Sequence, residues 1–110
     1  MTPHEITLNY VPGPNPNDEP EFLPDPNPIA PKRGDTIRFK LGIGPSGGKI
    51  RVTFAAPGRF SAGTFHHDDP PVRVEQSITS PTTYHCELLV DGVVKASSKE
   101  GGDIVPPTEI

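Results

Sequence analysis

The chain has little sulfur and few aromatic side chains. Its 110 residues include one cysteine, Cys86, one methionine and no tryptophan. A single cysteine excludes an internal disulfide and agrees with a reducing compartment. No apolar run approaches the roughly 20 residues of a membrane-spanning helix, and the N-terminus lacks the basic and apolar regions of a secretory signal. We therefore expect a cytoplasmic protein with no membrane partner, or an exported one if a leader has been removed.

The chain also lacks an excess of positive charge. Its 10 Lys and Arg residues stand against 14 Asp and Glu, for a net charge of −4, and the acidic excess follows residue 55. Proteins that bind nucleic acid neutralise the phosphate backbone with clustered cations. The sequence offers no such stripe, so nucleic acid is not an expected partner.

Proline and glycine are abundant, with 16 and 11 residues, whereas hydrophobic residues make up 32%. We therefore predict a modest core within one domain, residues 1–110. It divides into a proline-rich loop over 11–33, a folded core over 34–105 and a C-terminal tail over 106–110. The apolar residues of the core fall in short alternating runs, which favours a folded centre over disorder.

The segment from Val11 to Pro31 contains eight prolines. Each proline removes a backbone donor and disfavours helix before it, which predicts an extended, polyproline-like loop that is either ordered or mobile. Within it, Phe22, Leu23 and Ile29 are the residues that would hold the loop against the domain. Its last part, residues 28–33, also fits the Pro-x-x-Pro-x-Arg form that SH3-type grooves accept, against the simpler interpretation of plain loop.

Apolar and polar residues alternate with the period of a strand at several places. The predicted strands are residues 6–10, 36–41, 49–54, 72–75, 83–90, 93–97 and 103–106. The second and third of these are candidates for a hairpin, and Asp91-Gly92 predicts a type I′ turn between residues 83–90 and 93–97. No helix pattern is present. The sequence thus predicts an all-β fold, an antiparallel Greek-key β-sandwich of about six to eight strands with a long proline-rich loop.

Two short motifs carry a resemblance to known families. Tyr84-x-Cys86 on a late strand is similar to the tyrosine-corner strand of immunoglobulin-like folds and to the late strand of cupredoxins. The Gly34-Asp35-Thr36-Ile37-x-Phe39 run is similar to a strand opening common in cupredoxin-like domains. Both resemblances imply a β-sandwich. The resemblance to cupredoxins also implies a copper site made of two histidines, a cysteine and an axial methionine. No histidine follows Cys86 and the only methionine is Met1. We therefore expect a cupredoxin-like β-sandwich that lacks this copper site.

A weaker metal hypothesis uses His66, His67, Asp69 and Cys86 as ligands of a divalent ion. In an extended chain neighbouring side chains point to opposite faces, so His67 and Asp69 would share an ion unless a tight turn intervenes. The alternative is an exposed polar loop tip. Cys86 is expected inside, with Tyr84 and Leu88, which places His85 on the outer face and argues against a Cys–His catalytic pair.

The remaining motifs do not specify a function. The glycine-rich run 42–49 lacks the spacing of a phosphate-binding loop, because Ile43 stands where a glycine is needed. We therefore expect a non-enzymatic binding or structural module with no required cofactor, a monomer or weak dimer acting on an unknown protein or small-molecule partner. The alternative is a copper- or zinc-binding cupredoxin-like protein. An enzyme is the third hypothesis, because distant residues can still converge.

Overall fold

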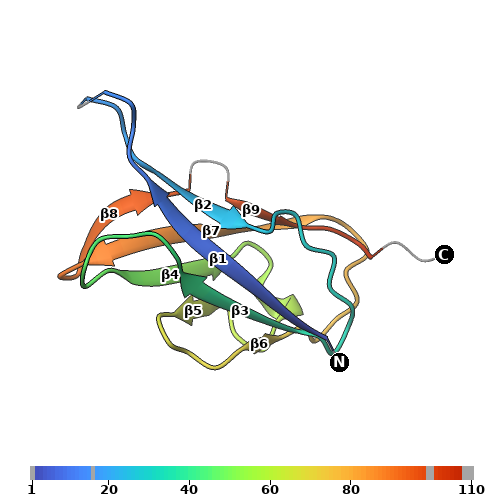
Figure 1. Cartoon of the computed structure of the whole chain (residues 1–110). Coiled ribbons are helices and arrows are strands. Elements are labelled where there is room, and N and C mark those ends of the chain that lie inside the picture. Colours follow the sequence, from blue (N-terminus) through green and yellow to red (C-terminus); the bar gives the residue numbers. More distant parts are fainter. Residues whose placement is uncertain (1, 16, 99–100, 108–110) are drawn as a thin grey trace.

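The computed structural model describes residues 2–15, 17–98 and 101–107, and these form an all-β fold (Figure 1). The predicted C-terminal tail, residues 106–110, lies partly outside this range. The described part holds one short 3-10 helix over Pro57–Arg59, and none of its helices is long and apolar enough to cross a membrane. The strands are β1 (Pro3–Val11), β2 (Glu21–Asp25), β3 (Thr36–Leu41), β4 (Lys49–Phe54), β5 (Thr64–His66), β6 (Val72–Arg73), β7 (Thr82–Val90), β8 (Val93–Ser97) and β9 (Gly102–Ile104).

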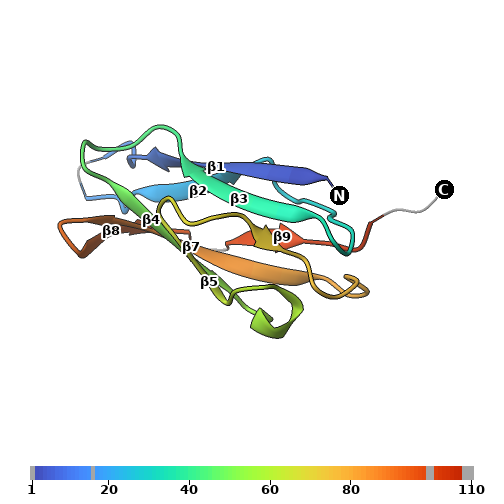
Figure 2. The same cartoon turned by 90° about the horizontal axis from the view of Figure 1, so that it is seen from below.

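The described strands form one mixed sheet in the order β5-β4-β7-β8-β2-β1-β3-β6, with β9 also paired to β7. This sheet is nearly closed into a flattened barrel. Figure 2 shows β1 and β3 on one side of it and β4, β5, β7 and β8 on the other. The apolar faces of the two sides enclose the core.

The predicted antiparallel Greek-key sandwich is therefore wrong in two respects. First, β1 pairs with β3 in parallel, and β2 pairs with β8 in parallel through Glu21 and Ser97, so the sheet is mixed. Second, backbone hydrogen bonds close one side of the fold: Ile29 N donates to Asp103 O at 3.1 Å and Val105 N donates to Ile29 O at 2.9 Å. Two separate sheets would have open edges there, whereas here Ile29 of the proline-rich segment forms an isolated bridge to Ile104 of β9.

The sequence predicted that the whole proline-rich segment is a loop, but part of it forms a strand. It contains β2, whose Phe22 is fully buried, and Pro24 lies within that strand. Further along, Ile29 and Pro31 are also buried. Burial of Pro31 leaves the Pro-x-x-Pro-x-Arg run unable to lie in an SH3-type groove. Phe22 and Ile29 hold this segment against the barrel, whereas Leu23 remains exposed.

The strand predictions for residues 36–41 and 49–54 are confirmed as β3 and β4, but they do not form a hairpin. β3 lies between β1 and β6, and β4 lies between β5 and β7. Alternation identifies a strand and its buried face but says nothing of its partner. The hairpin of β7 and β8 is confirmed, and both turn residues, Asp91 and Gly92, have the positive φ of a type I′ turn.

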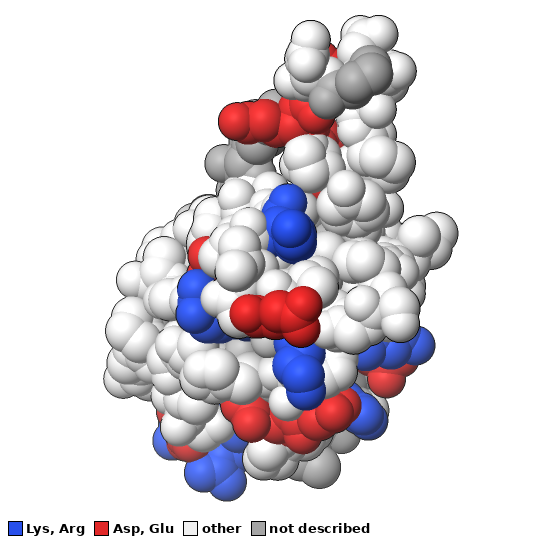
Figure 3. All heavy atoms as spheres, turned by 90° about the vertical axis from the view of Figure 1, so that its left-hand side faces the viewer, with Lys and Arg blue, Asp and Glu red and all other residues white. Residues whose placement is uncertain are grey.

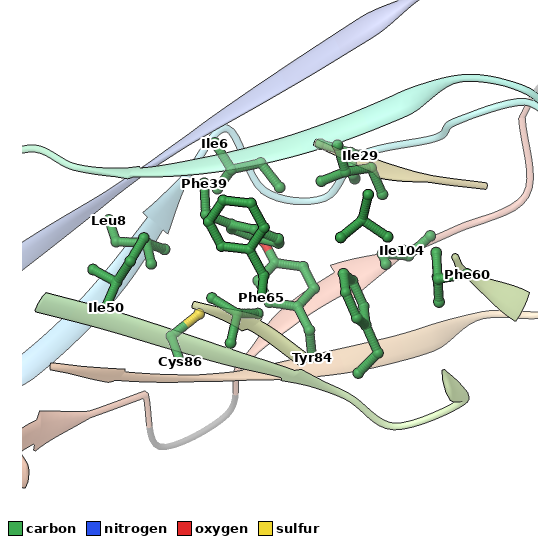
Figure 4. Packing of buried hydrophobic residues seen from close by; sticks show 14 of the residues in the cluster. Ile6, Leu8, Ile29, Phe39, Ile50, Phe60, Phe65, Tyr84, Cys86 and Ile104 are labelled. Carbon is green, nitrogen blue, oxygen red and sulfur yellow. The ribbon is translucent and has the colours of Figure 1, made fainter. Parts of the chain in front are cut away.

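A single buried cluster fills the barrel (Figure 4). Its aromatic centre is Phe39, which contacts Tyr84 edge to face with ring centroids 5.1 Å apart, while Phe54 stacks on Phe60 at 4.3 Å. Burial raises the pKa of Tyr84 well above its usual value. Among the described residues its hydroxyl has no hydrogen-bond partner, so the bond that defines a tyrosine corner is not formed there. The buried hydrophobic residues are Ile6, Leu8, Phe22, Ile29, Ile37, Phe39, Ile50, Val52, Phe54, Phe60, Phe65, Val72, Val74, Ile78, Tyr84, Cys86, Leu88, Ala96 and Ile104.

Candidate functional site

The outer face of β4 and β7 bears the candidate site. Arg51 lies opposite Glu87 on β7 and opposite His66 on β5, and Lys49 lies opposite Leu89. A cleft of about 370 Å³ opens over this face between the turn after β5 and the β7–β8 turn. Its lining includes Lys49, Arg51, His66, His67, Leu89 and Asp91, and we call it the β4–β7 cleft.

A tight turn over residues 66–69 forms one wall of the cleft. Asp68 has φ of 64°, Asp69 N donates to His66 O at 3.0 Å, and His66 N donates to Asp69 Oδ2 at 2.8 Å. The turn brings His66 Nδ1 to 3.4 Å from Asp69 Oδ2. The paired residues are therefore His66 and Asp69, not His67 and Asp69 as strand alternation had suggested.

The His67 ring is held in a defined orientation. The Ile50 backbone N–H donates to His67 Nδ1 at 3.3 Å, and His67 Nε2 lies 3.6 Å from Asp68 Oδ2. Because Nδ1 accepts a hydrogen bond, the neutral ring carries its proton on Nε2. His67 thus presents a donor whose position is set by the edge of β4.

Two cations of the lining differ in their partners. Arg51 donates to Glu87 Oε1 through Nε and lies 2.9 Å from the same oxygen through Nη2. Charge-assisted hydrogen bonds of this kind fix the guanidinium across the face of the sheet. Lys49 and Asp91 form no ion pair among the described residues. They are the opposite charges that the cleft leaves available to a ligand.

Cys86 lies apart from this cleft, inside the barrel. It is fully buried on β7 opposite Val52, and Figure 4 shows its sulfur pointing into the core. Burial raises the pKa of the thiol to about 12, although a hydrogen bond with Ser98 acts in the opposite direction. The thiol therefore stays protonated and is not a nucleophile, because the thiolate is the reactive form. His85 is exposed on the opposite face of β7, as alternation predicted.

Ser98 supports Cys86 through the backbone. Ser98 Oγ accepts a hydrogen bond from Cys86 N at 2.9 Å, and Ser98 N donates to Cys86 O at 2.9 Å. Ser98→Ala removes the acceptor from a buried N–H, which is expected to lower the free energy of unfolding by about 1 kcal/mol in chemical denaturation. Ser97→Ala is the matched control, because the Ser97 side chain makes no hydrogen bond in the described part of the chain. Equal destabilisation by the two variants would contradict the assignment.

The structure does not assemble the metal ligands suggested by the sequence. His66, His67 and Asp69 lie at the cleft, whereas Cys86 lies on the inner side of the sheet. Within residues 2–15, 17–98 and 101–107, no group of three or more His, Cys, Asp or Glu side chains could hold a metal ion. His66 and Asp69 are the pair that local geometry brings together.

Sequence reasoning did not identify Lys49, Arg51, Leu89 and Asp91 as lining residues. Lys49 and Arg51 belong to β4, Leu89 to β7 and Asp91 to the turn after β7, and the register of β4 against β7 brings them together. No local motif contains that register. Away from the cleft, His4 Nε2 lies 2.9 Å from the buried carboxylate of Asp35.

The chain was compared with protein families, curated proteins and solved structures. No protein-family model, curated protein or solved structure matches it. The likeness to cupredoxin-like and immunoglobulin-like domains thus rests on the two short motifs alone and stays a prediction.

Proposed function

We propose that this protein is a non-enzymatic binding module and that the β4–β7 cleft receives its ligand. The observation that carries the proposal is a concave site in which oriented polar groups surround an apolar side chain. Its volume of about 370 Å³ falls in the range of small-molecule sites, which combine apolar lining with a few placed polar groups. Ion pairing of Arg51 and the hydrogen bond to His67 preorganise the site before any ligand arrives.

The lining defines the chemistry of the ligand. Leu89 offers an apolar contact, Lys49 and His67 Nε2 offer donors, and the Asp91 carboxylate offers an acceptor. A small amphipathic zwitterion with an apolar group, such as an amino acid, supplies the three complementary features. Binding is expected to be weak to moderate, because the cleft is open to solvent and exposed charges interact weakly in water.

A titration followed by amide chemical shifts tests the proposal. L-Phenylalanine is the first probe, with 3-phenylpropionate lacking the ammonium group and phenethylamine lacking the carboxylate. We expect L-phenylalanine to perturb the amides of Lys49, His67 and Gly92 more than either analogue does. Lys49→Ala should weaken the response to phenylpropionate, and Asp91→Asn the response to phenethylamine.

The variants are chosen to preserve the fold. Asn-Gly is a preferred type I′ turn pair, so Asp91→Asn keeps the hairpin while removing the charge. Lys32→Ala removes an exposed cation outside the cleft and serves as the control. Shifts scattered over the surface, or equal effects of Lys32→Ala and Lys49→Ala, would refute ligand binding in the cleft.

A second candidate function is metal binding, which the contact of His66 with Asp69 favours. Imidazole and carboxylate are both zinc ligands, but stable sites use four donors. Thermal melts of metal-stripped protein with Cu(I), Cu(II), Zn(II) or Ni(II) test this function, since an ion that binds the folded state raises the melting temperature. A rise abolished by His66→Ala and unchanged by Cys86→Ala would establish a site at this turn. No rise with any ion would eliminate the metal function.

A further inference from the structure

A two-stranded arm projects from the barrel beyond its closed part. It consists of the ends of β1 and β2 at Val11 and Glu21 and of the residues between them, residues 11–21 with residue 16 excepted, and it is visible in Figures 1 and 3. The molecule is correspondingly elongated, with extents of 46 × 25 × 19 Å. The β4–β7 cleft does not include the arm.

Exposed apolar side chains gather at the base of the arm. The described residues include five exposed large hydrophobic side chains, and Val11 and Leu23 are two of them, 42% and 44% exposed. They lie diagonally on the same outer face, because Val11 pairs with Glu21 and Leu23 with Asn9. Ile43, 72% exposed, is held beside them: its N–H donates to Asn9 Oδ1 at 2.8 Å, and its carbonyl accepts from Tyr10 N at 2.8 Å. Such a cluster on a projecting element is typical of a binding surface.

The charge of the arm complements one kind of partner. Residues 11–21 contain three carboxylates and no lysine or arginine. Asp18, Glu19 and Glu21 form no ion pair in the described part of the chain. A hollow of about 300 Å³ lies between the two halves of the arm, bordered by Val11, Pro14 and these acidic residues.

We propose that the arm docks a basic polypeptide segment that also presents apolar side chains. Its apolar residues would cover Val11, Leu23 and Ile43, and its Lys or Arg side chains would face the carboxylates of the arm. Apolar contact at the centre and complementary charge at the rim is the usual division of a protein interface. A second copy of this chain fits less well, because two arms of the same negative charge repel each other.

The proposal is tested by titrating the full chain with a short peptide of alternating lysine and valine, followed by amide chemical shifts. Lysine–serine and glutamate–valine peptides of equal length separate the contributions of charge and apolar contact. We expect the lysine–valine peptide to perturb residues of the arm and Ile43 and to bind about tenfold more tightly than either control, with affinity falling as salt rises.

Two arm variants and a charge-matched control complete the test. Asp18→Asn with Glu19→Gln and Glu21→Gln, and separately Leu23→Ser, should each weaken lysine–valine binding about tenfold. Glu5→Gln with Glu75→Gln and Asp103→Asn removes the same charge elsewhere and should leave binding within about twofold. Equal loss in the two triple variants, equal binding of the lysine–serine peptide, absence of binding, or a dimer that buries the arm in sedimentation would overturn the proposal.

Discussion

Gly102→Ala is expected to lower the free energy of unfolding by about 3 kcal/mol, the largest single effect predicted for this chain. Gly102 lies opposite Tyr84 in the pairing of β9 with β7, and a Cβ added at Gly102 would overlap the Tyr84 ring. The ring has no free space to enter, because Tyr84 is only 2% exposed and contacts Phe39 and Phe54. The added methyl group must therefore displace either the aromatic cluster or β9. Chemical denaturation gives the measurement.

Gly58→Ala is the matched control for this prediction. A Cβ added at Gly58 meets no atom within 4 Å, so alanine there should change stability by less than about 0.5 kcal/mol. A double-mutant cycle with Tyr84→Leu isolates the overlap, because the shorter side chain vacates the space above Gly102 and the alanine should then cost much less. Similar effects of Gly102→Ala and Gly58→Ala, or additive effects in the cycle, would contradict the explanation.

Seven of the nine described strands were predicted because apolar and polar residues alternate along them, whereas β2 and β5 were not predicted. The buried residues Ile37 and Phe39 of β3, and Ile50, Val52 and Phe54 of β4, follow from the period of two. The fold was not predictable in the same way. The alternation of polar and apolar residues in β3 allows it to pair with β4 as well as with β1. Its actual partner, β1, is parallel and far away in the sequence, and such a pairing leaves no local sequence signal.

The proline-rich segment shows a second limit of sequence reasoning. Proline disfavours central strands, so Pro24 argued against the strand that contains it. Burial of Phe22 overrides this local preference, and β2 occupies the position between β1 and β8. The same segment supplies the strand neighbours that turn an expected sandwich into a nearly closed barrel.

The candidate site was predicted only in part. His66 and His67 were identified because polar, ligand-type residues stood together in the sequence. Lys49 and Leu89 belong to the site because β4 and β7 pair in one particular register, and either would occupy the outer face of any such strand. The expected partner of Asp69 was His67, but the turn over residues 66–69 places His66 beside it. The reason is that the positive φ of Asp68 interrupts the extended backbone.

Asp35 is a buried carboxylate that joins the N-terminal segment to the turn before β3. Its Oδ1 accepts from Thr2 N at 2.9 Å, and its Oδ2 accepts from Lys32 N and pairs with His4 Nε2, both at 2.9 Å. Burial opposes ionisation, but these hydrogen bonds outweigh it and lower the pKa of Asp35 from 3.8 to about 2. A carboxylate in this position is stabilising because it satisfies three donors at once.

Asp35→Asn is expected to lower the free energy of unfolding by about 2 kcal/mol at neutral pH. The amide that replaces Oδ2 turns a donor toward the Lys32 N–H and His4, so two contacts become unfavourable. The pH dependence has a definite sign. Because the folded-state pKa is lowered, the wild-type contribution is complete above pH 4 and is lost as the pH falls from about 4 to about 2.

Chemical denaturation of wild type and Asp35→Asn at neutral pH and at several points down to about pH 2.5 tests both the size and the sign. The difference between the two proteins should narrow as the pH falls below 4, since protonated Asp35 has also lost its charge. Glu5→Gln is the control carboxylate. Glu5 pairs with Lys40 at 2.7 Å, but both side chains are about half exposed, so its removal should matter little. A difference that stays constant with pH would show that Asp35 acts through shape rather than through its ionised carboxylate.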